Sequence, residues 1–598
     1  MAEHSAAFAH RTLADFVVFL RQAHGSRERF FTVVRDDGEL EAFSCETLMA
    51  RVHALVAAFE HGRLEPGDRV AIYAENRPEW HLIDFACQLF GAVSVPIYPD
   101  LPADQVGYIV RDSGAAWVAY SGASRRAVLE DLVGWLDPAP LLLAIDRETA
   151  PADGVVLDDL LAHGALRTAS LPWDALRERV SPDDLSSLLY TSVTTGQPKG
   201  VMLTHGNLAS NLLAACEVYP GPGGAEEQAV CFLPLSHVFA RTTCHTFLNL
   251  AIAIHYVQDV EALPEALMRV RPTVMASVPL VFETAFTKIH QAIDDDGGAK
   301  KTLFDWAVEG GRHVLDQKLE AGSVGLLASA RRAVADRLVF KKILDRFGGR
   351  LRFVVAGGAP LPEQVEIFFQ AVGVGIYQGY GLTETSPMVT INYPGRYRPG
   401  STGATAPGVE IRLAEDGEIL VHGPGVMRGY WRLPEATAEV LGPDGWFRTG
   451  DVGAIDDDGF LFITGRKKEI IVTSNGDNIA PVPIEHLLAA APVVAQALVV
   501  GDDRPHLGAL VVPDWDRLGL MGRPEDLVDD DKVVDQLRDV VASVNRLLPE
   551  HEKVRCLGLV PRPFTVDSGE LTPTLKIRRA VVLERQQETV DRIYAPPT

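Results

Sequence analysis

Cysteine is scarce and positive charge is in deficit in this 598-residue sequence. The six cysteines include no Cys-x-x-Cys pair, and a chain of this size does not depend on disulfides for its core. We therefore expect free, buried thiols in a reducing compartment. Lys and Arg number 56 against 80 Asp and Glu, which gives a formal net charge of −24. Because so acidic a surface repels phosphate backbones, we expect no nucleic-acid partner, although a local basic site could hold a small anion.

Long apolar runs are also missing. No stretch approaches the roughly 18 apolar residues that a membrane span requires, and charged residues interrupt residues 1–22, so this segment lacks a signal-peptide core. We therefore expect a cytoplasmic protein. No basic amphipathic helix stands out as a membrane anchor, so any peripheral contact with the inner face of a membrane would be transient. The oligomeric state, monomer or homodimer, is left open.

Strands and helices alternate through the first part of the chain. Residues 70–73 form a short apolar run, residues 77–92 have helical apolar spacing, and residues 93–99 resemble a second strand. This alternation predicts an α/β fold with mostly parallel sheets covered by helices. Residues 283–350 are long, charged and helix-prone, whereas residues 400–464 contain short strands separated by Gly- and Asp-rich turns.

The length of the chain predicts more than one domain. We expect a large N-terminal domain over residues 1–464, including a small β-rich subdomain at about 400–464. A hinge follows at 465–468, and a small α+β C-terminal domain covers 469–598.

A polar loop at residues 190–200, YTSVTTGQPKG, lies between two apolar runs that are predicted strands. Hydroxyl groups and backbone N–H groups can surround phosphate oxygens, glycine permits close approach, and lysine supplies positive charge. The loop does not fit the common P-loop pattern, because no Gly-x4-Gly-Lys-Ser/Thr run is present. A polar surface hairpin is the alternative interpretation.

The loop and seven further motifs, in the same order along the chain, resemble the adenylate-forming acyl-CoA synthetases, the family related to firefly luciferase. That family's usual loop reads YTSGTTGxPKGV, which this chain matches except at Val193. The other matches are LPLSHVFAR (233–241), RPTVMASVP (271–279), VAGGAPL (355–361), YQGYGLTETSP (377–387), GWFRTGDVG (445–453), GRKKEIIVTSNGDNIAP (465–481) and GELTPTLKIRR (569–579). The resemblance covers essentially the whole chain and implies ATP, Mg²⁺ and CoA as cofactor and co-substrates.

The resemblance also implies a set of binding residues. The pyrophosphate end of ATP would lie against Ser192, Thr194, Thr195, Gly196 and Lys199. The adenine and ribose would be held by Gly357, Gly358, Ala359, Gly379, Tyr380, Thr383, Asp451 and Arg466. Glu384 would bind Mg²⁺, because hard oxygen ligands suit this ion. Outside the family context, Asp451 could be an ordinary turn residue and the segment around Glu384 a helix cap.

The resemblance assigns the reacting groups as well. Lys576 would stabilise the negative charge that develops when a carboxylate attacks the α-phosphate, and His237 would shape the approach of that carboxylate. Lys468 would be the hinge of a C-terminal domain that swings between two half-reactions. The loop around Gly476 would then approach the thiol arm of CoA.

The long helix-prone insert between residues 283 and 355 resembles the long-chain fatty-acid branch of the family. Two departures stand against the pattern: Val193 replaces a glycine, and Leu280 replaces a frequent arginine. A β-branched residue disfavours positive φ and could crowd the phosphates, so we expect Val193 to weaken the use of ATP rather than abolish it. Two alternatives remain: an acyl-AMP ligase that loads a carrier protein, and a catalytically weak relative that binds nucleotide or fatty acid.

Overall fold

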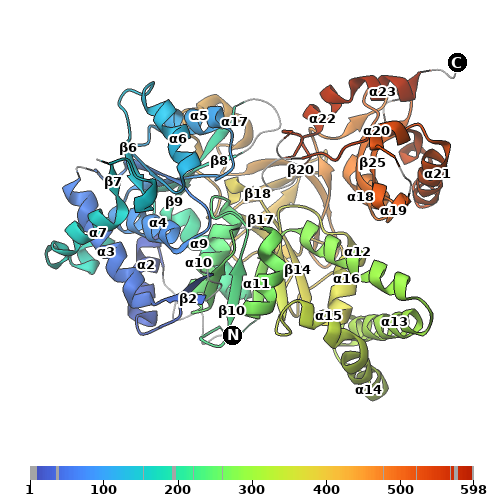
Figure 1. Cartoon of the computed structure of the whole chain (residues 1–598), viewed down its shortest axis with the longest axis horizontal. Coiled ribbons are helices and arrows are strands. Elements are labelled where there is room, and N and C mark those ends of the chain that lie inside the picture. Colours follow the sequence, from blue (N-terminus) through green and yellow to red (C-terminus); the bar gives the residue numbers. More distant parts are fainter. Residues whose placement is uncertain are drawn as a thin grey trace.

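The fold is described from a computed structural model that covers residues 10–34, 40–62, 64–152, 154–191, 197–219, 221, 223–258, 260–475, 477–519, 522–565, 568–571 and 577–595. Two large sheets and the helices around them form the N-terminal part, and a smaller group of elements forms the C-terminal end (Figure 1). The predicted α/β class, with mostly parallel sheets and a separate small C-terminal part, is confirmed.

The first large sheet has nine strands in the order β16-β15-β14-β13-β12-β10-β11-β1-β2. Its centre is parallel from β1 through β14, while β2, β15 and β16 are antiparallel additions at the edges. The strands are β1 (Phe31–Val34), β2 (Leu40–Phe43), β10 (Gln228–Cys231), β11 (Ala253–Tyr256), β12 (Val274–Ser277), β13 (Phe353–Ala356), β14 (Gly375–Gly381), β15 (Met388–Ile391) and β16 (Ala404–Thr405).

The second large sheet has eight strands in the order β19-β9-β8-β4-β3-β5-β6-β7. These are β3 (Arg69–Tyr73), β4 (Val93–Ile97), β5 (Trp117–Tyr120), β6 (Leu141–Ala144), β7 (Val155–Val156), β8 (Leu185–Thr191), β9 (Lys199–Thr204) and β19 (Gly429–Tyr430). Strands β8 and β9 are antiparallel neighbours. The predicted strands on either side of the polar loop are therefore confirmed.

The largest apolar core joins the two sheets. It combines side chains of β3 and β11 with those of α2 (Leu13–His24), α3 (Cys45–His61), α4 (Pro78–Phe90), α9 (His205–Val218) and α10 (Val238–Asn249). Helix α4 is buried along its whole length, including Trp80 and Phe85, which fits a layer between two sheets. The remaining helices of this half are α5 (Ala103–Ser113), α6 (Ala123–Val133), α7 (Leu157–Ala165) and α8 (Trp173–Glu178).

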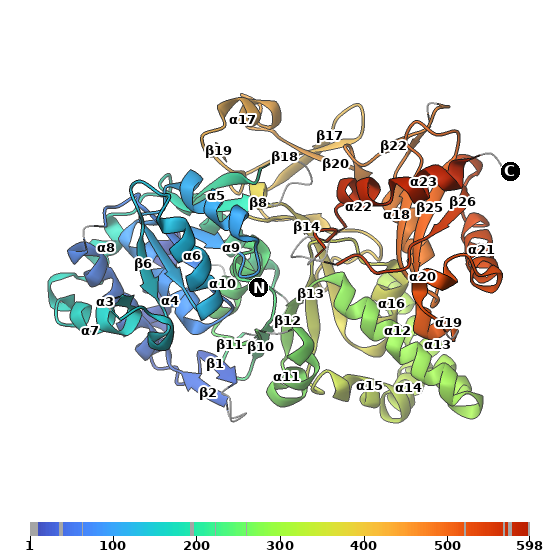
Figure 2. The ribbon, with the colours of Figure 1, turned by 45° about the horizontal axis from the view of Figure 1, so that its top comes forward.

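A second core lies under the predicted helical insert. It packs one face of the nine-stranded sheet against α11 (Leu263–Val270), α12 (Pro279–Asp296), α13 (Gly298–Ala321), α15 (Lys341–Arg346) and α16 (Glu363–Val372). Helix α14 (Leu326–Ala335) continues into a π-helical turn, η4 (Asp336–Phe340), and then into α15. Helices α13 and α14 project from the lower edge of the molecule (Figures 1 and 2).

Smaller sheets make up the remainder. A four-stranded sheet contains β17 (Glu410–Leu413), β18 (Glu418–His422), β20 (Phe447–Ile455) and β21 (Leu461–Arg466), with α17 (Pro434–Val440) beside it in sequence. The C-terminal part contains β22 (Ile471–Val472), β23 (Asn478–Ile479), β24 (Val494–Val500), β25 (Leu507–Pro513) and β26 (Val554–Leu559). Its helices are α18 (Pro481–Ala489), α19 (Trp515–Leu518), α20 (Pro524–Leu527), α21 (Asp531–Asn545), α22 (Arg579–Arg585) and α23 (Gln587–Tyr594).

Two expectations about composition can be compared with the fold. All six cysteines are free, as predicted; Cys216 and Cys556 are half-buried and the other four are buried. Over the described ranges, no helix combines the length and the apolar character needed to cross a bilayer.

Candidate nucleotide and acyl site

One cavity of about 1340 Å³ lies where the two large sheets, the four-stranded sheet and the C-terminal part meet. It receives residues from elements that are far apart in the sequence, including α10, β14, β20 and α22. The predicted site residues that line it are Lys199, His237, Gly357, Gly358, Gly379, Tyr380, Thr383, Glu384, Asp451, Arg466 and Lys468. The chain therefore gathers most of the predicted residues into one space.

Some predicted residues are not in this set. Ala359 is exposed and is not among the residues that line the cavity. Ser192, Thr194, Thr195, Gly196, Gly476 and Lys576 lie outside the described residues, as does Val193. Their described neighbours Thr191 and Ile577 do line the cavity.

Asp451 is the centre of a buried polar cluster at one end of the cavity. It lies on β20, is only 3% exposed, and faces Arg466 on the neighbouring strand β21. The Arg466 Nε donates to Asp451 Oδ1 at 2.8 Å, and the Tyr380 hydroxyl donates to Oδ2 at 2.7 Å. The backbone N–H of Asp451 donates to the Thr449 hydroxyl at 3.0 Å. The carboxylate is thus fixed in direction, with its charge balanced by Arg466.

Glu384 lies close to this cluster in a short turn after β14. The Tyr430 hydroxyl donates to Glu384 Oε1 at 2.8 Å, and the Lys199 Nζ lies 4.8 Å from the centre of the Tyr430 ring. Burial raises the pKa of the Glu384 carboxyl, because removal from water disfavours its charged form. No ion pair with Glu384 occurs within the described ranges, so a cation placed here would stabilise its ionised form.

His237 begins the helix that forms one wall of the cavity. It is the N-cap of α10, and its Nδ1 accepts a hydrogen bond from the backbone N–H of Phe239 at 3.1 Å. Gly358, which also lines the cavity, has a φ of +89°, a conformation that side chains disfavour. Next to it, a Cβ on Gly357 would meet the Phe239 ring at 3.4 Å. Glycine therefore allows the backbone to approach this wall closely.

The same cavity has an apolar branch whose lining residues no sequence motif predicts. It runs between α9 and α10 on one side and β13 to β15 on the other, past Thr242, Thr246 and Phe247. Phe247 lies ten positions after His237 on α10, about 15 Å along a helix that rises 1.5 Å per residue. The branch thus leads deep into the core from the polar end.

Three aromatic rings stand in the wall of this branch. The Tyr219 and Phe353 rings are 5.2 Å apart in an edge-to-face arrangement, and the Tyr377 ring lies 6.4 Å from that of Phe353. The Tyr219 hydroxyl donates to Glu227 Oε2 at 2.7 Å, and Glu227 is ion-paired with Arg352. These polar contacts hold the Tyr219 ring in place.

A buried ion pair ties α10 to α4, and its arginine also reaches the second sheet. Both Arg241 and Asp84 have no exposed surface, and Arg241 donates to the two Asp84 oxygens at 2.7 and 3.0 Å. Arg241 also donates to the Ser187 hydroxyl of β8 at 2.6 Å. The helix that begins at His237 is thereby fixed to the strand that ends at Thr191, so the pair positions two walls of the cavity.

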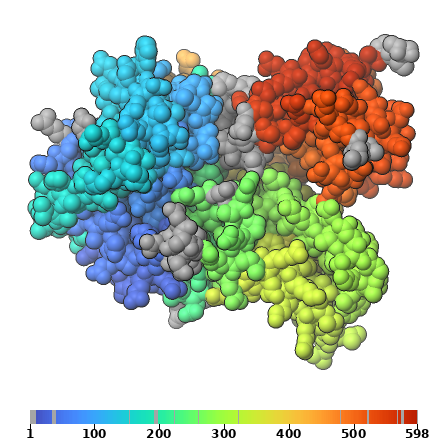
Figure 3. Space-filling model, viewed as in Figure 1, coloured from blue at the N-terminus to red at the C-terminus, as the bar shows by residue number. Residues whose placement is uncertain are grey.

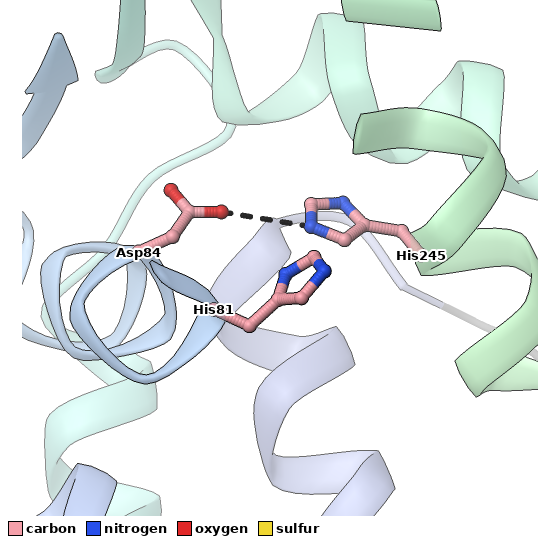
Figure 4. A group of neighbouring side chains, drawn as sticks. All are labelled: His81, Asp84 and His245. Atoms are coloured by element: carbon pink, nitrogen blue, oxygen red, sulfur yellow. Dashed lines mark ion pairs between the residues drawn. The ribbon is translucent and has the colours of Figure 1, made fainter. Parts of the chain in front are cut away.

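Two histidines complete this cluster. His245 Nε2 lies 3.5 Å from Asp84 Oδ2, and His81 lies beside them with its ring edge toward the group (Figure 4). Ligand atoms of the three residues lie within 4.8 Å of one another, which resembles a metal site. However, Arg241 already neutralises Asp84, and its charge would repel a cation. We interpret the group as a structural ion pair.

The chain is anchored just before the predicted hinge. Lys467 Nζ contacts Asp416 Oδ2 at 2.5 Å and Glu418 Oε2 at 3.1 Å, and its backbone N–H donates to Gly450 at 2.8 Å. Beyond Lys468, the C-terminal part contributes Val499, Gly501, Ile577 and Arg579 to the cavity, among others. The C-terminal part therefore closes one side of the cavity in this conformation.

Two family models match the chain over both of these parts. One, described as AMP-binding enzyme, matches residues 19–431, and one described as AMP-binding enzyme C-terminal domain matches residues 468–597. The chain belongs to the AMP-binding enzyme family. The suspected resemblance to adenylate-forming acyl-CoA synthetases is thus confirmed.

Relatives of known name match over nearly the full length. The long-chain-fatty-acid–CoA ligase FadD15 of Mycobacterium bovis is 37% identical over 581 residues, 93% of this chain and 93% of the relative. Long-chain-fatty-acid–CoA ligase 1 of Cavia porcellus is 31% identical over 563 residues, 89% of this chain and 79% of the relative. The long-chain branch of the family is therefore confirmed as well.

A solved structure shows the same fold. The adenylation domain of a carboxylate reductase from Mycobacterium chelonae has a TM-score of 0.75 at 24% identity, covering 100% of this chain and 93% of that one.

Proposed function

We propose that this protein is an AMP-forming long-chain fatty acid–CoA ligase, which activates a fatty acid with ATP to an acyl-adenylate and transfers the acyl group to CoA. The observation that carries the proposal is the single cavity that joins a polar end around Asp451 to an apolar branch along α10. The names of the full-length relatives support the same reaction.

The polar end suits a nucleotide. The Asp451 carboxylate, directed by Tyr380 and Arg466, would accept hydrogen bonds from both ribose hydroxyls. The adenine would lie against Gly379, Tyr380 and Thr383. On its other side would be the backbone of Gly357 and Gly358, which lacks side chains and so permits close approach. Lys199 would face the β- and γ-phosphates together with the hydroxyl groups of the polar loop.

Glu384 fits the Mg²⁺ that this family implies. Its carboxylate is buried, receives a hydroxyl donor from Tyr430, and has a pKa raised by burial, so a cation beside it would relieve an unfavourable charge. When bound, Mg²⁺ supplies charge neutralisation for the phosphate oxygens. The role of the chain is to hold this oxygen ligand in a fixed direction near Lys199.

Two groups would act on the reacting atoms. His237 would orient the fatty-acid carboxylate at the mouth of the apolar branch. The carboxylate oxygen then attacks the α-phosphorus, the bond from that phosphorus to the pyrophosphate oxygen breaks, and pyrophosphate leaves. Lys576 would stabilise the charge at the α-phosphate, and Ile577, its neighbour, lines the cavity.

Transfer to CoA requires a different arrangement. The thiolate sulfur attacks the acyl carbon of the acyl-adenylate, the carbon–oxygen bond to AMP breaks, and AMP leaves with its phosphate. Lys467 is tied to the four-stranded sheet, so Lys468 is the first residue at which the C-terminal domain could turn. That turn would bring the loop around Gly476 toward the thiol.

The apolar branch would hold the hydrocarbon chain of the acid. An extended chain advances about 1.3 Å per carbon, given bonds of about 1.5 Å, so the distance from His237 to Phe247 accommodates at least about ten carbons. Tyr219, Phe353 and Tyr377 would limit the length beyond that. Because such acids partition into lipid, a transient membrane contact is part of the proposal.

The test is AMP release with ATP, Mg²⁺ and CoA over a series of fatty acids of rising length. We expect AMP and acyl-CoA in equal amounts, with the rate highest for long chains. ATP-dependent acylation of a carrier protein, with release of AMP and without any thioester of CoA, would favour the acyl-AMP ligase instead. Binding of ATP and fatty acid without AMP release would overturn the enzymatic proposal and favour the weak relative.

A further inference from the structure

One exposed face runs along α14, the π-helical turn η4 and α15. Leu326 and Leu327, at the start of α14, are 91% and 87% exposed, more than any other large apolar residue in the described part of the chain. Val334 and Leu338 continue this face at 48% and 47% exposure. Exposed apolar residues grouped in this way mark an interaction surface.

The π-helical turn keeps this face continuous. A regular helix advances about 100° per residue, so position 337 would return to within about 20° of Leu326, whereas positions 341 and 342 would lie about 60° and about 160° away from it. The wider turn at Asp336–Phe340 reduces that drift. Arg337, Lys341 and Lys342 are consequently exposed on the same side as the leucines, while Ala335, Phe340 and Ile343 are buried on the opposite side.

The charge of this segment is opposite to that of the molecule. Residues 326–346 contain six Lys and Arg against two Asp, in a chain whose formal net charge is −24. One of the two, Asp336, is paired with Arg332 at 2.7 Å. The other, Asp345, follows Lys341 by four positions and borders the same surface hollow as Arg337 and Lys341. Within the described ranges no ion pair engages Arg337, Lys341 or Lys342. These cations are therefore available to an external anion.

We propose that this face, the Leu326–Lys342 face, docks the protein on an anionic lipid membrane. Leu326 and Leu327 would enter the region between headgroups and acyl chains, while Arg337, Lys341 and Lys342 contact the anionic headgroups. The acidic remainder of the surface is repelled by the same lipids, which favours docking through this face. Docking here would bring the enzyme to the lipid bilayer, into which its fatty-acid substrate partitions. This advantage rests on the proposed function.

The shape of the region favours a bilayer over a protein partner. Helices α13 and α14 project from the body, and this part of the chain stands clear at the lower right of the space-filling view (Figure 3). A projecting leucine pair offers little area for a shape-matched protein, which needs about 800 Å² on each side. A fluid bilayer accepts such a projection without a matching surface.

The membrane-docking character of this segment is hidden in the sequence for a structural reason. No basic amphipathic helix stands out in the sequence, because the leucines and the cations fall at different ends of the segment and the π-helical turn is not visible in its spacing. Only the fold shows that both ends face the same side.

The experiment is sedimentation of the full-length protein with vesicles of phosphatidylcholine and phosphatidylglycerol in equal amounts, at low and high salt. One variant carries Leu326→Ser and Leu327→Ser, and a second carries Arg337→Glu, Lys341→Glu and Lys342→Glu. Matched controls are Leu166→Ser, at an 82% exposed leucine, and Arg523→Glu with Lys532→Glu and Arg538→Glu on the C-terminal part.

We expect the unchanged protein to bind these vesicles and to release in high salt. The triple charge reversal should weaken binding by tenfold or more, because each basic residue near an anionic surface contributes about fivefold. The double serine variant should also weaken binding severalfold, while both controls bind normally. Melting temperatures of all variants should match, because every changed residue is exposed.

Three results would overturn the proposal. The first is failure of the unchanged protein to bind the vesicles at low salt. The second is equal vesicle binding by the variants and the controls. The third is loss of self-association in the variants, which would mean that the face joins two copies of the chain. AMP release from detergent-dispersed fatty acid is measured in parallel. Its absence in the unchanged protein would refute the proposed function and leave the vesicle result standing.

Discussion

The Tyr380 hydroxyl donates a 2.7 Å hydrogen bond to the Asp451 carboxylate, joining a residue at the end of β14 to one on β20. The two side chains come from different sheets, 71 positions apart in the sequence. Because one faces the predicted adenine position and the other the predicted ribose position, their bond couples two parts of the nucleotide pocket. Arg466 completes the arrangement by pairing with the second oxygen of Asp451.

Replacing Asp451 by Asn should weaken the use of ATP. The change removes the negative charge that balances Arg466. It also removes one oxygen acceptor of a charge-assisted hydrogen bond, and such a bond contributes about 1.5–3 kcal/mol. We expect KM for ATP to rise by about tenfold to a hundredfold with KM for CoA unchanged, in steady-state AMP release. Tyr380→Phe is the milder control, because the carboxylate and Arg466 remain. Equal KM values for ATP in Asp451→Asn and the unchanged protein would contradict the assignment.

Lys576→Ala should block the first half-reaction alone. Loss of a group that stabilises developing charge costs about 10²–10³ in rate, so ATP–pyrophosphate exchange should fall by about that factor. Thioester formation from supplied acyl-adenylate and CoA should persist near the normal rate. Lys532→Ala, an exposed lysine of the same domain, serves as the control. Equal loss in both half-reactions would show that Lys576 supports the domain rather than the chemistry.

The sequence predicted the elements that follow local rules. The apolar run at 70–73 is a strand, residues 78–90 are a buried helix, and the insert after residue 283 is helical. Each was visible because apolar periodicity reports which side of an element is buried. The gathering of Asp451, Glu384 and Lys199 in one cavity followed from the family motifs, since these residues come from separate elements that no local pattern joins.

The remaining features depend on tertiary neighbours. Tyr219, Phe353 and Tyr377 form one aromatic wall only because α9 ends beside β13 and β14. The Asp84–Arg241 pair was not predicted, because a charged residue within an apolar helix gives no indication of its partner. Both contacts are set by how layers pack, which periodicity does not encode.

Val193→Gly should increase the efficiency of ATP use. If the family's glycine adopts a left-handed torsion, valine there costs about 1–2 kcal/mol, which corresponds to about fivefold to thirtyfold in kcat/KM for ATP. We therefore expect the glycine variant to be faster by that factor, measured by AMP release for both proteins together. Val193→Ala should not recover the rate, since it keeps a Cβ. Equal rates for the glycine variant and the unchanged protein would show that valine fits the loop without strain.

Glu366→Gln should reduce the pH dependence of stability. Glu366 on α16 is fully buried; its Oε2 accepts from the Gly400 N–H at 3.0 Å, and burial raises its pKa to about 7. The folded protein therefore keeps a proton that the unfolded chain releases near its ordinary value of 4.5. The stability from this group is present below that value and is lost as pH rises through about 7.

Glutamine carries no titrating proton at this position, so the variant should lose less stability between about pH 5 and pH 8. The difference is up to about 3 kcal/mol, from 1.36 kcal/mol per pKa unit. Melting temperature against pH measures it, and Glu363→Gln, an exposed residue on the same helix, is the control. Parallel curves for Glu366→Gln and the unchanged protein would mean that Glu366 is ionised when folded.

Tyr219→Ala should shift the preferred fatty acid to longer chains. Removal of the ring opens space next to Phe353 at the inner part of the apolar branch, so the rate profile over acid length should move by two or more carbons. Tyr219→Phe keeps the ring and loses only the hydrogen bond to Glu227, and its profile should stay close to the original. A uniform fall in rate at every length would indicate loss of packing, whereas an unchanged profile for Tyr219→Ala would show that the hydrocarbon chain does not reach this wall.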